Sequence, residues 1–70
     1  MAVTVRYGVN AVTHERFAGM SVGDIRDDVA EDLNVPSAAE ARLNGNPAAD
    51  DAQVREGETL EFVKTAGEKG

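Results

Sequence analysis

The fold is decided by residues 21–34, which read SVGDIRDDVAEDLN. Ser21 can accept a hydrogen bond from the free backbone amides that begin a helix, and Asp24 three residues later completes a pattern like a capping box. Beyond this cap an apolar side chain recurs at spacings of three, four and four residues: Val22, Ile25, Val29 and Leu33. That spacing predicts a helix over residues 21–34 with one apolar stripe. Asn34 and Pro36 end it, because the residue before a proline avoids helical backbone angles.

The chain before this helix predicts a β-hairpin. Val3, Val5 and Tyr7 alternate with polar or small residues, which is typical of a strand with one buried face. Residues 8–11 contain turn-forming Gly and Asn, and residues 12–18 supply a second run of β-forming side chains. Two strands this close in sequence are expected to pair.

The chain after the helix predicts shorter strands and turns. Residues 40–44 predict a short strand, residues 44–47 a tight turn, and residues 59–65 a closing strand. In the polar connection before that strand, Val54 is the expected core anchor. This order predicts an α+β fold of the β-grasp type, with a mixed sheet of about four or five strands packed on one helix. We expect the last strand to lie centrally, next to the first.

The 70 residues fit one domain, for which we take residues 1–65, followed by a small, polar and mobile tail over residues 66–70. So short a chain has a thin core, which excludes a deep pocket roofed by a second domain and with it most small-molecule enzymology. The absence of cysteine excludes disulfides, thiolate nucleophiles and Cys-based metal sites. No apolar run has the length of a membrane helix, and the first residues lack a signal-peptide layout. We therefore expect a cytoplasmic protein that is not an enzyme.

The charge of the chain bears on its partners. It has 13 acidic and 7 basic side chains, for a formal net charge of -6. The basic residues are scattered singly, so neither nucleic acid nor an anionic membrane is expected as a partner. Two interpretations of the acidity stay open: attraction to a basic groove on a protein partner, or solubility alone. We expect a monomer.

Several short stretches, taken in order, resemble the small sulfur-carrier proteins. Residues 17–22 (FAGMSV) resemble their strand-to-helix junction, residues 43–46 (LNGN) their short strand and turn, and residues 54–62 (VREGETLEF) their turn into the final strand. Together these stretches resemble the ubiquitin-like β-grasp superfamily, which includes the thiamin-type sulfur carriers and the small subunit of molybdopterin synthase. Residues 62–70 (FVKTAGEKG) resemble the bacterial ubiquitin-like proteins, some of which finish in Gly-x-Lys-Gly.

The resemblance implies a functional role for the C-terminal tail: Ala66, Gly67, Glu68, Lys69 and Gly70. In the sulfur carriers the chain ends in two adjacent glycines, and an adenylating enzyme of the ubiquitin-activating type activates the terminal carboxylate for thiocarboxylate or isopeptide formation. Glycine suits a tail that threads a narrow channel. Here Glu68 and Lys69 separate the two glycines. Three uses of the tail remain open: activation at Gly70, as in a protein modifier or a sulfur carrier; cleavage after Gly67 by a processing peptidase; or no chemistry, as in a structural interaction domain.

The remaining candidate sites lie on the predicted strands, the helix and the loops. If the alternating apolar residues of the first and last strands face the helix, Val12 and Val63 point outward and form a candidate docking surface. His14 has no second histidine for a metal site, so we interpret it as a surface residue. Two clusters of acidic residues are interpreted as solvated, because the one on the helix has no calcium-loop pattern and the one in the loop has no pocket: Asp27, Asp28, Glu31 and Asp32, and Asp50 and Asp51. We expect no catalytic residue, no metal and no cofactor.

Overall fold

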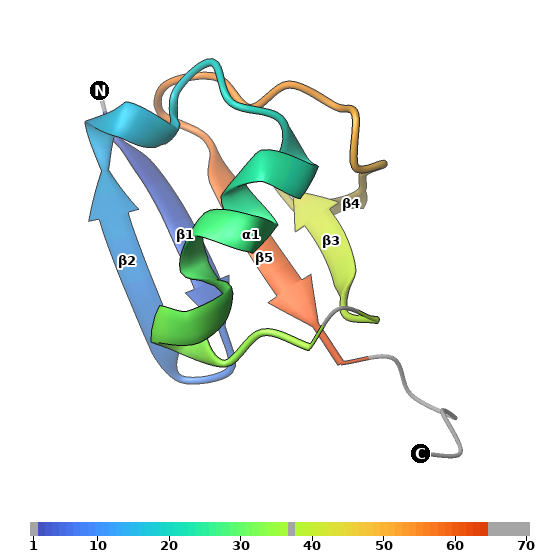
Figure 1. The fold of residues 1–70 in the computed structure, drawn as a ribbon. Coiled ribbons are helices and arrows are strands. Elements are labelled where there is room, and N and C mark those ends of the chain that lie inside the picture. The colour runs from blue at the N-terminus through green and yellow to red at the C-terminus, as the bar shows by residue number, and fades with distance from the viewer. Residues whose placement is uncertain (1, 37, 65–70) are drawn as a thin grey trace.

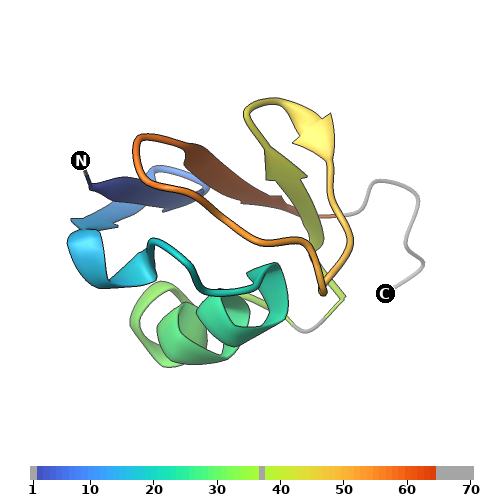
Figure 2. The ribbon, with the colours of Figure 1, turned by 90° about the horizontal axis from the view of Figure 1, so that it is seen from above.

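A five-stranded sheet lies against one helix in the computed structural model, which describes residues 2–36 and 38–64 (Figure 1). The elements follow in the order β1 (Val3–Tyr7), β2 (Asn10–His14), the 3-10 helix η1 (Glu15–Phe17), α1 (Val22–Leu33), β3 (Glu40–Leu43), β4 (Asn46–Pro47) and β5 (Thr59–Val63). Seen from above, α1 covers one face of the sheet, and none of the described elements covers the other, uncovered face (Figure 2). This arrangement confirms the predicted α+β class and is compatible with a β-grasp.

The sheet is mixed, and its strand order is β2-β1-β5-β3-β4. The first and last strands run parallel side by side, with Val5 opposite Leu60 and Tyr7 opposite Phe62. β5 also pairs antiparallel with β3, so it has a neighbour on both sides. The expectation that the last strand is central and lies next to the first is confirmed. Its mixed apolar content fits this position, because a central strand is covered along both edges.

The helix forms where its cap and its apolar stripe predict it. α1 begins after Ser21, whose Oγ accepts a hydrogen bond from the Asp24 amide at 3.1 Å. It ends at Asn34, which adopts a left-handed backbone with a φ of 57°. The four residues of the predicted stripe are buried: Val22, Ile25, Val29 and Leu33. Burying this stripe against the sheet stabilises a helix too short to persist alone in water.

The Ser21 cap allows a direct test. Replacing Ser21 by alanine is expected to lower the free energy of unfolding by about 1 kcal/mol, because one amide of the first helical turn loses its acceptor. The midpoint of a urea titration followed by circular dichroism measures the loss. Ser21→Thr keeps a hydroxyl at the same place and should stay within about 0.5 kcal/mol of the unchanged protein. Equal losses in the two variants would contradict the capping role.

The loop before β5 is tied to the start of α1. The helical amides of Val22 and Gly23 donate to the carbonyls of Ala52 and Asp50, each at 2.9 Å. Two residues after Ala52 in this loop, the Val54 amide donates to the Met20 carbonyl at 2.9 Å. Val54 is fully buried, as predicted, and joins the single core between sheet and helix. These bonds fix a stretch that otherwise has little regular structure.

The second half of the hairpin differs from the prediction. Residues 12–18 were expected to form a strand, but β2 stops at His14 and η1 follows. Phe17 lies in η1 and is fully buried. A continuing edge strand would alternate side chains across the sheet, whereas the turn of η1 brings Phe17 down into the core. The His14 Nδ1 accepts a hydrogen bond from the Arg16 amide at 3.0 Å and caps this turn.

The tight turn predicted at residues 44–47 joins β3 to β4. Asn44 and Gly45 have φ of 53° and 89°, and Leu43 pairs with Asn46. Positive φ at both central residues belongs to the hairpin turn for which Asn-Gly is the preferred sequence. The Asn44 side chain also binds the start of β5, because its Oδ1 accepts from the Thr59 amide at 3.1 Å. The turn signal in the sequence is therefore confirmed, with the two-residue strand β4 following it.

Candidate functional site

The predicted tail, Ala66, Gly67, Glu68, Lys69 and Gly70, lies outside the described residues, as does Thr65, the last residue of the predicted closing strand. The structure describes the residues that lead to the tail, up to Lys64. β5 ends at Val63 in the middle of the sheet, and the next residue, Lys64, is exposed. The residues that precede the tail therefore lie between β1 and β3 and not at an outer edge of the sheet (Figure 1).

The two residues of the predicted docking surface lie on opposite faces of the sheet. Val12 pairs with Val5, which is fully buried, so Val12 shares the helix-facing side and packs against the core. Val63 is half-buried and follows the buried Phe62, so its side chain points to the uncovered face. The structure does not bring Val12 and Val63 together.

The uncovered face carries charge where an apolar patch was considered. Arg6, Glu61 and Arg42 are direct cross-strand neighbours on β1, β5 and β3. Arg42 also lies 3.7 Å from a carboxylate oxygen of Glu40. Alternating charges across neighbouring strands attract one another, by roughly 0.2–1 kcal/mol for each pair. A partner that docks on this face meets arginine and carboxylate groups.

One large apolar side chain is strongly exposed among the residues described. Val9 is 98% exposed in the turn between β1 and β2. The sequence offered a signal that was not used, because Val9 stands between the turn-forming residues Gly8 and Asn10. Gly8 has a φ of 62°, so the chain turns sharply there and carries Val9 away from the sheet.

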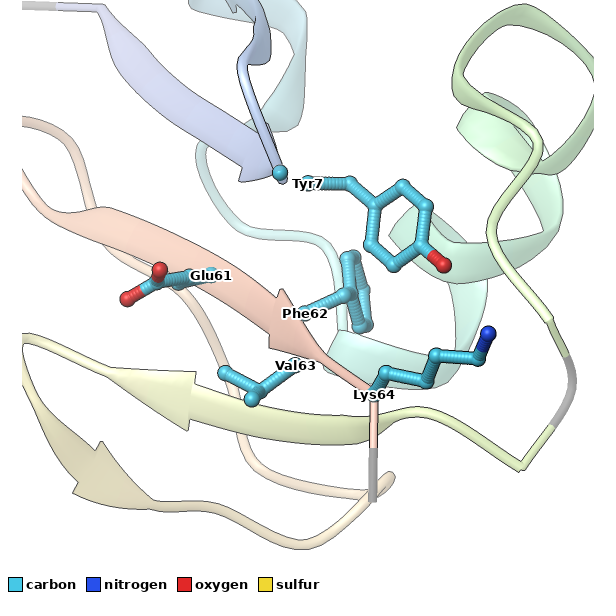
Figure 3. A pocket seen from close by; sticks show the side chains of 6 residues that line it. Tyr7, Glu61, Phe62, Val63 and Lys64 are labelled. Atoms are coloured by element: carbon cyan, nitrogen blue, oxygen red, sulfur yellow. The ribbon is translucent and has the colours of Figure 1, made fainter. Parts of the chain in front are cut away.

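A shallow pocket opens next to this turn, where β1 has ended and β5 continues. It has a volume of about 370 Å³. Its lining comes from both strands and the turn: Tyr7, Gly8, Glu61, Phe62, Val63 and Lys64. Figure 3 shows the rings of Tyr7 and Phe62 and the extended side chain of Lys64 on the same side of β5. Sequence reasoning missed this pocket, because its two halves are separated by more than fifty residues of chain.

Arg26 on α1 was also missed, and it links three parts of the fold. Its guanidinium donates to the Ala39 carbonyl at 3.0 Å and lies 3.2 Å from a carboxylate oxygen of Asp50. The same group sits 5.4 Å from the centre of the Phe62 ring, a cation–π contact. Arg26 therefore connects the residue before β3, the loop before β5 and the buried ring of Phe62. No pattern in the sequence indicated these contacts.

The other polar candidates take structural roles or stay on the surface. Asp28 forms an ion pair with Arg16 at 2.7 Å. Asp50 is the partner of Arg26 and remains largely exposed. Within residues 2–36 and 38–64, no group of three or more His, Cys, Asp or Glu side chains is placed to hold a metal ion. In the same part of the chain, no helix is long and apolar enough to cross a membrane.

Comparison of the sequence with known proteins assigns the chain to no family. No protein-family model matches the chain, and no curated protein matches it.

Proposed function

We propose that this chain is a small ubiquitin-like protein of the prokaryotic cytoplasm. It acts as a protein modifier or protein-binding module through the uncovered face of its sheet and its C-terminal tail. Its partner is an adenylating enzyme or a processing peptidase. The functional residues are those of the tail, Ala66, Gly67, Glu68, Lys69 and Gly70, with Gly70 as the reactive carboxylate.

One observation supports this proposal above the others. In the sequence the tail follows β5 after only Lys64 and Thr65, and β5 has β1 on one side and β3 on the other. An enzyme that takes up the tail therefore has a broad sheet surface beside its entrance, and it can recognise the body before it reacts with the end. The charged row of Arg6, Glu61 and Arg42 gives that surface a specific pattern to read.

The experiment is intact-mass measurement of the full-length protein after incubation with cell extract, with and without ATP. A protein modifier is expected to form ATP-dependent conjugates that contain the chain joined through Gly70. A sulfur carrier would instead gain the mass of one oxygen exchanged for sulfur, and processing would remove the residues after Gly67. Each of these results identifies a different use of the tail.

Two variants control this experiment. Deleting residues 68–70 is expected to abolish ATP-dependent conjugation through Gly70, because the terminal carboxylate then belongs to Gly67 and lies three residues closer to the body. Glu68→Gln changes the same segment without removing its end, and it should still react. If the mass of the full-length protein never changes under any condition, the modifier and carrier functions are both wrong and an interaction domain with an inert tail remains.

A further inference from the structure

We propose that the pocket beside the end of β5 binds an extended segment of a partner protein. The segment carries a carboxylate two residues away from an apolar side chain. This binding needs no covalent chemistry at the tail, so it stands or falls independently of the function proposed above.

The pocket lies where two paired strands of equal length are offset by one residue. The last register pair between β1 and β5 is Tyr7 with Phe62. β1 then turns away at Gly8, while β5 continues one residue further, to Val63, and Lys64 follows it. The space left beside Lys64 is the pocket of about 370 Å³, and it has the position of a missing piece of strand.

Backbone geometry points one amide into this space. The Thr4 amide donates to the Glu58 carbonyl on the β1 side, and the Asn44 amide donates to the Thr59 carbonyl on the β3 side. Successive residues of a strand direct their polar backbone groups to opposite sides, so every second residue after Glu58 faces β1. Lys64 is the next residue of this series, one position past the end of β5, and it lies beyond Tyr7, the last residue of β1. An added strand can accept a hydrogen bond from the Lys64 amide.

The side chains determine the chemistry of the segment. Tyr7 and Phe62 lie on the same face, and their rings line the pocket with an apolar surface (Figure 3). Lys64 follows Phe62 by two residues, just past the end of β5, and its side chain lies on the same side as the two rings (Figure 3). None of the described residues forms an ion pair with the Lys64 ammonium. Glu61 points to the opposite face, where it lies between Arg6 and Arg42.

An extended peptide fits these features together. Its apolar side chain lies against Tyr7 and Phe62, its backbone meets the Lys64 amide, and its carboxylate pairs with the Lys64 ammonium. Because side chains two apart share one face of a strand, the apolar and acidic residues must be separated by one residue. This spacing holds whichever way the added strand runs.

Two peptides of identical composition test the spacing. Acetyl-Glu-Thr-Leu-Thr-Glu-amide places carboxylates two residues from leucine on either side, and acetyl-Thr-Glu-Leu-Glu-Thr-amide places them one residue away. Tyr7 is the only tyrosine of a chain without tryptophan, so its fluorescence reports binding at the pocket directly. We expect a saturable change with the first peptide and an affinity about three- to fivefold weaker with the second.

Two charge-matched variants complete the test. Lys64→Met is expected to lower the affinity for the first peptide about three- to fivefold, the effect of one exposed ion pair. Arg6→Met removes the same charge from the other face and should leave this affinity unchanged. Both side chains are exposed, so both variants should fold, which their urea midpoints will verify.

Several results would overturn the proposal. They are no saturable fluorescence change, equal affinities for the two peptides, or equal effects of Lys64→Met and Arg6→Met. Sedimentation of the protein alone gives a further outcome. Self-association that Lys64→Met abolishes would assign the pocket to a second copy of the chain and contradict peptide binding.

Discussion

Replacing Phe62 by alanine is expected to lower the free energy of unfolding by about 3–5 kcal/mol, as for other buried phenylalanines. The ring is 1% exposed and belongs to β5, with Tyr7 opposite it on one side and Ala41 on the other. Its loss leaves a cavity in a thin core and removes the surface on which the Arg26 guanidinium rests. A domain of this size has a total stability of roughly 4–10 kcal/mol, so the variant retains little folded population at elevated temperature.

Urea titration followed by circular dichroism measures this loss, and the adjacent residue supplies the control. Glu61 is on the same strand but points to the uncovered face. Glu61→Ala loses only its attractions to Arg6 and Arg42 and is therefore expected to cost at most about 2 kcal/mol. Similar losses for the two variants would mean that β5 does not present Phe62 to the helix.

Replacing Ile25 by aspartate is expected to prevent folding altogether. Ile25 is fully buried in the centre of the stripe that α1 presents to the sheet. A carboxylate there has no partner, and burying it costs more than such a small domain can offset. The amide proton NMR spectrum of the variant should lose the chemical-shift dispersion of a folded protein.

The reverse exchange on the same helix provides the control. Asp27 is exposed. Asp27→Ile replaces an aspartate by an isoleucine, the reverse of Ile25→Asp. This variant should fold, with a free energy of unfolding within about 0.5 kcal/mol of the unchanged protein. If Ile25→Asp folds as well as Asp27→Ile, the helix does not pack through the predicted stripe.

The elements predicted correctly depend on neighbours in the sequence. The helix cap at Ser21, the stripe from Val22 to Leu33 and the Asn-Gly turn are each fixed by residues within a few positions. The central place of β5 was also predicted, because its apolar content suits a strand covered along both edges. Local periodicity and turn chemistry were sufficient for these features.

The features that were missed depend on how distant segments meet. The orientation of Val12 follows from its pairing with the buried Val5, and the alternation in its own blurred strand did not reveal it. Phe17 reaches the core only because η1 turns the chain, a choice made by packing and not by β-propensity. Arg26 binds residues that lie 13 and 24 positions away in the sequence.

The candidate sites also differ in whether they depend on neighbouring residues or on distant segments. The tail was proposed from its resemblance to ubiquitin-like proteins and from its composition, both of which are properties of a continuous stretch. The pocket at Lys64 was not predicted, because it arises from the one-residue offset of β1 and β5 in a register that only the fold defines. The charged row on the uncovered face likewise becomes visible only once three strands are aligned.

The parallel pairing of the first and last strands positions the core, the pocket and the start of the tail. Nuclear Overhauser contacts between side-chain protons of β1 and β5 test it directly. The structure predicts contacts of Val5 with Leu60 and of Tyr7 with Phe62. Contacts in the opposite order, such as Val3 with Phe62, or no contacts between these two strands, would contradict it.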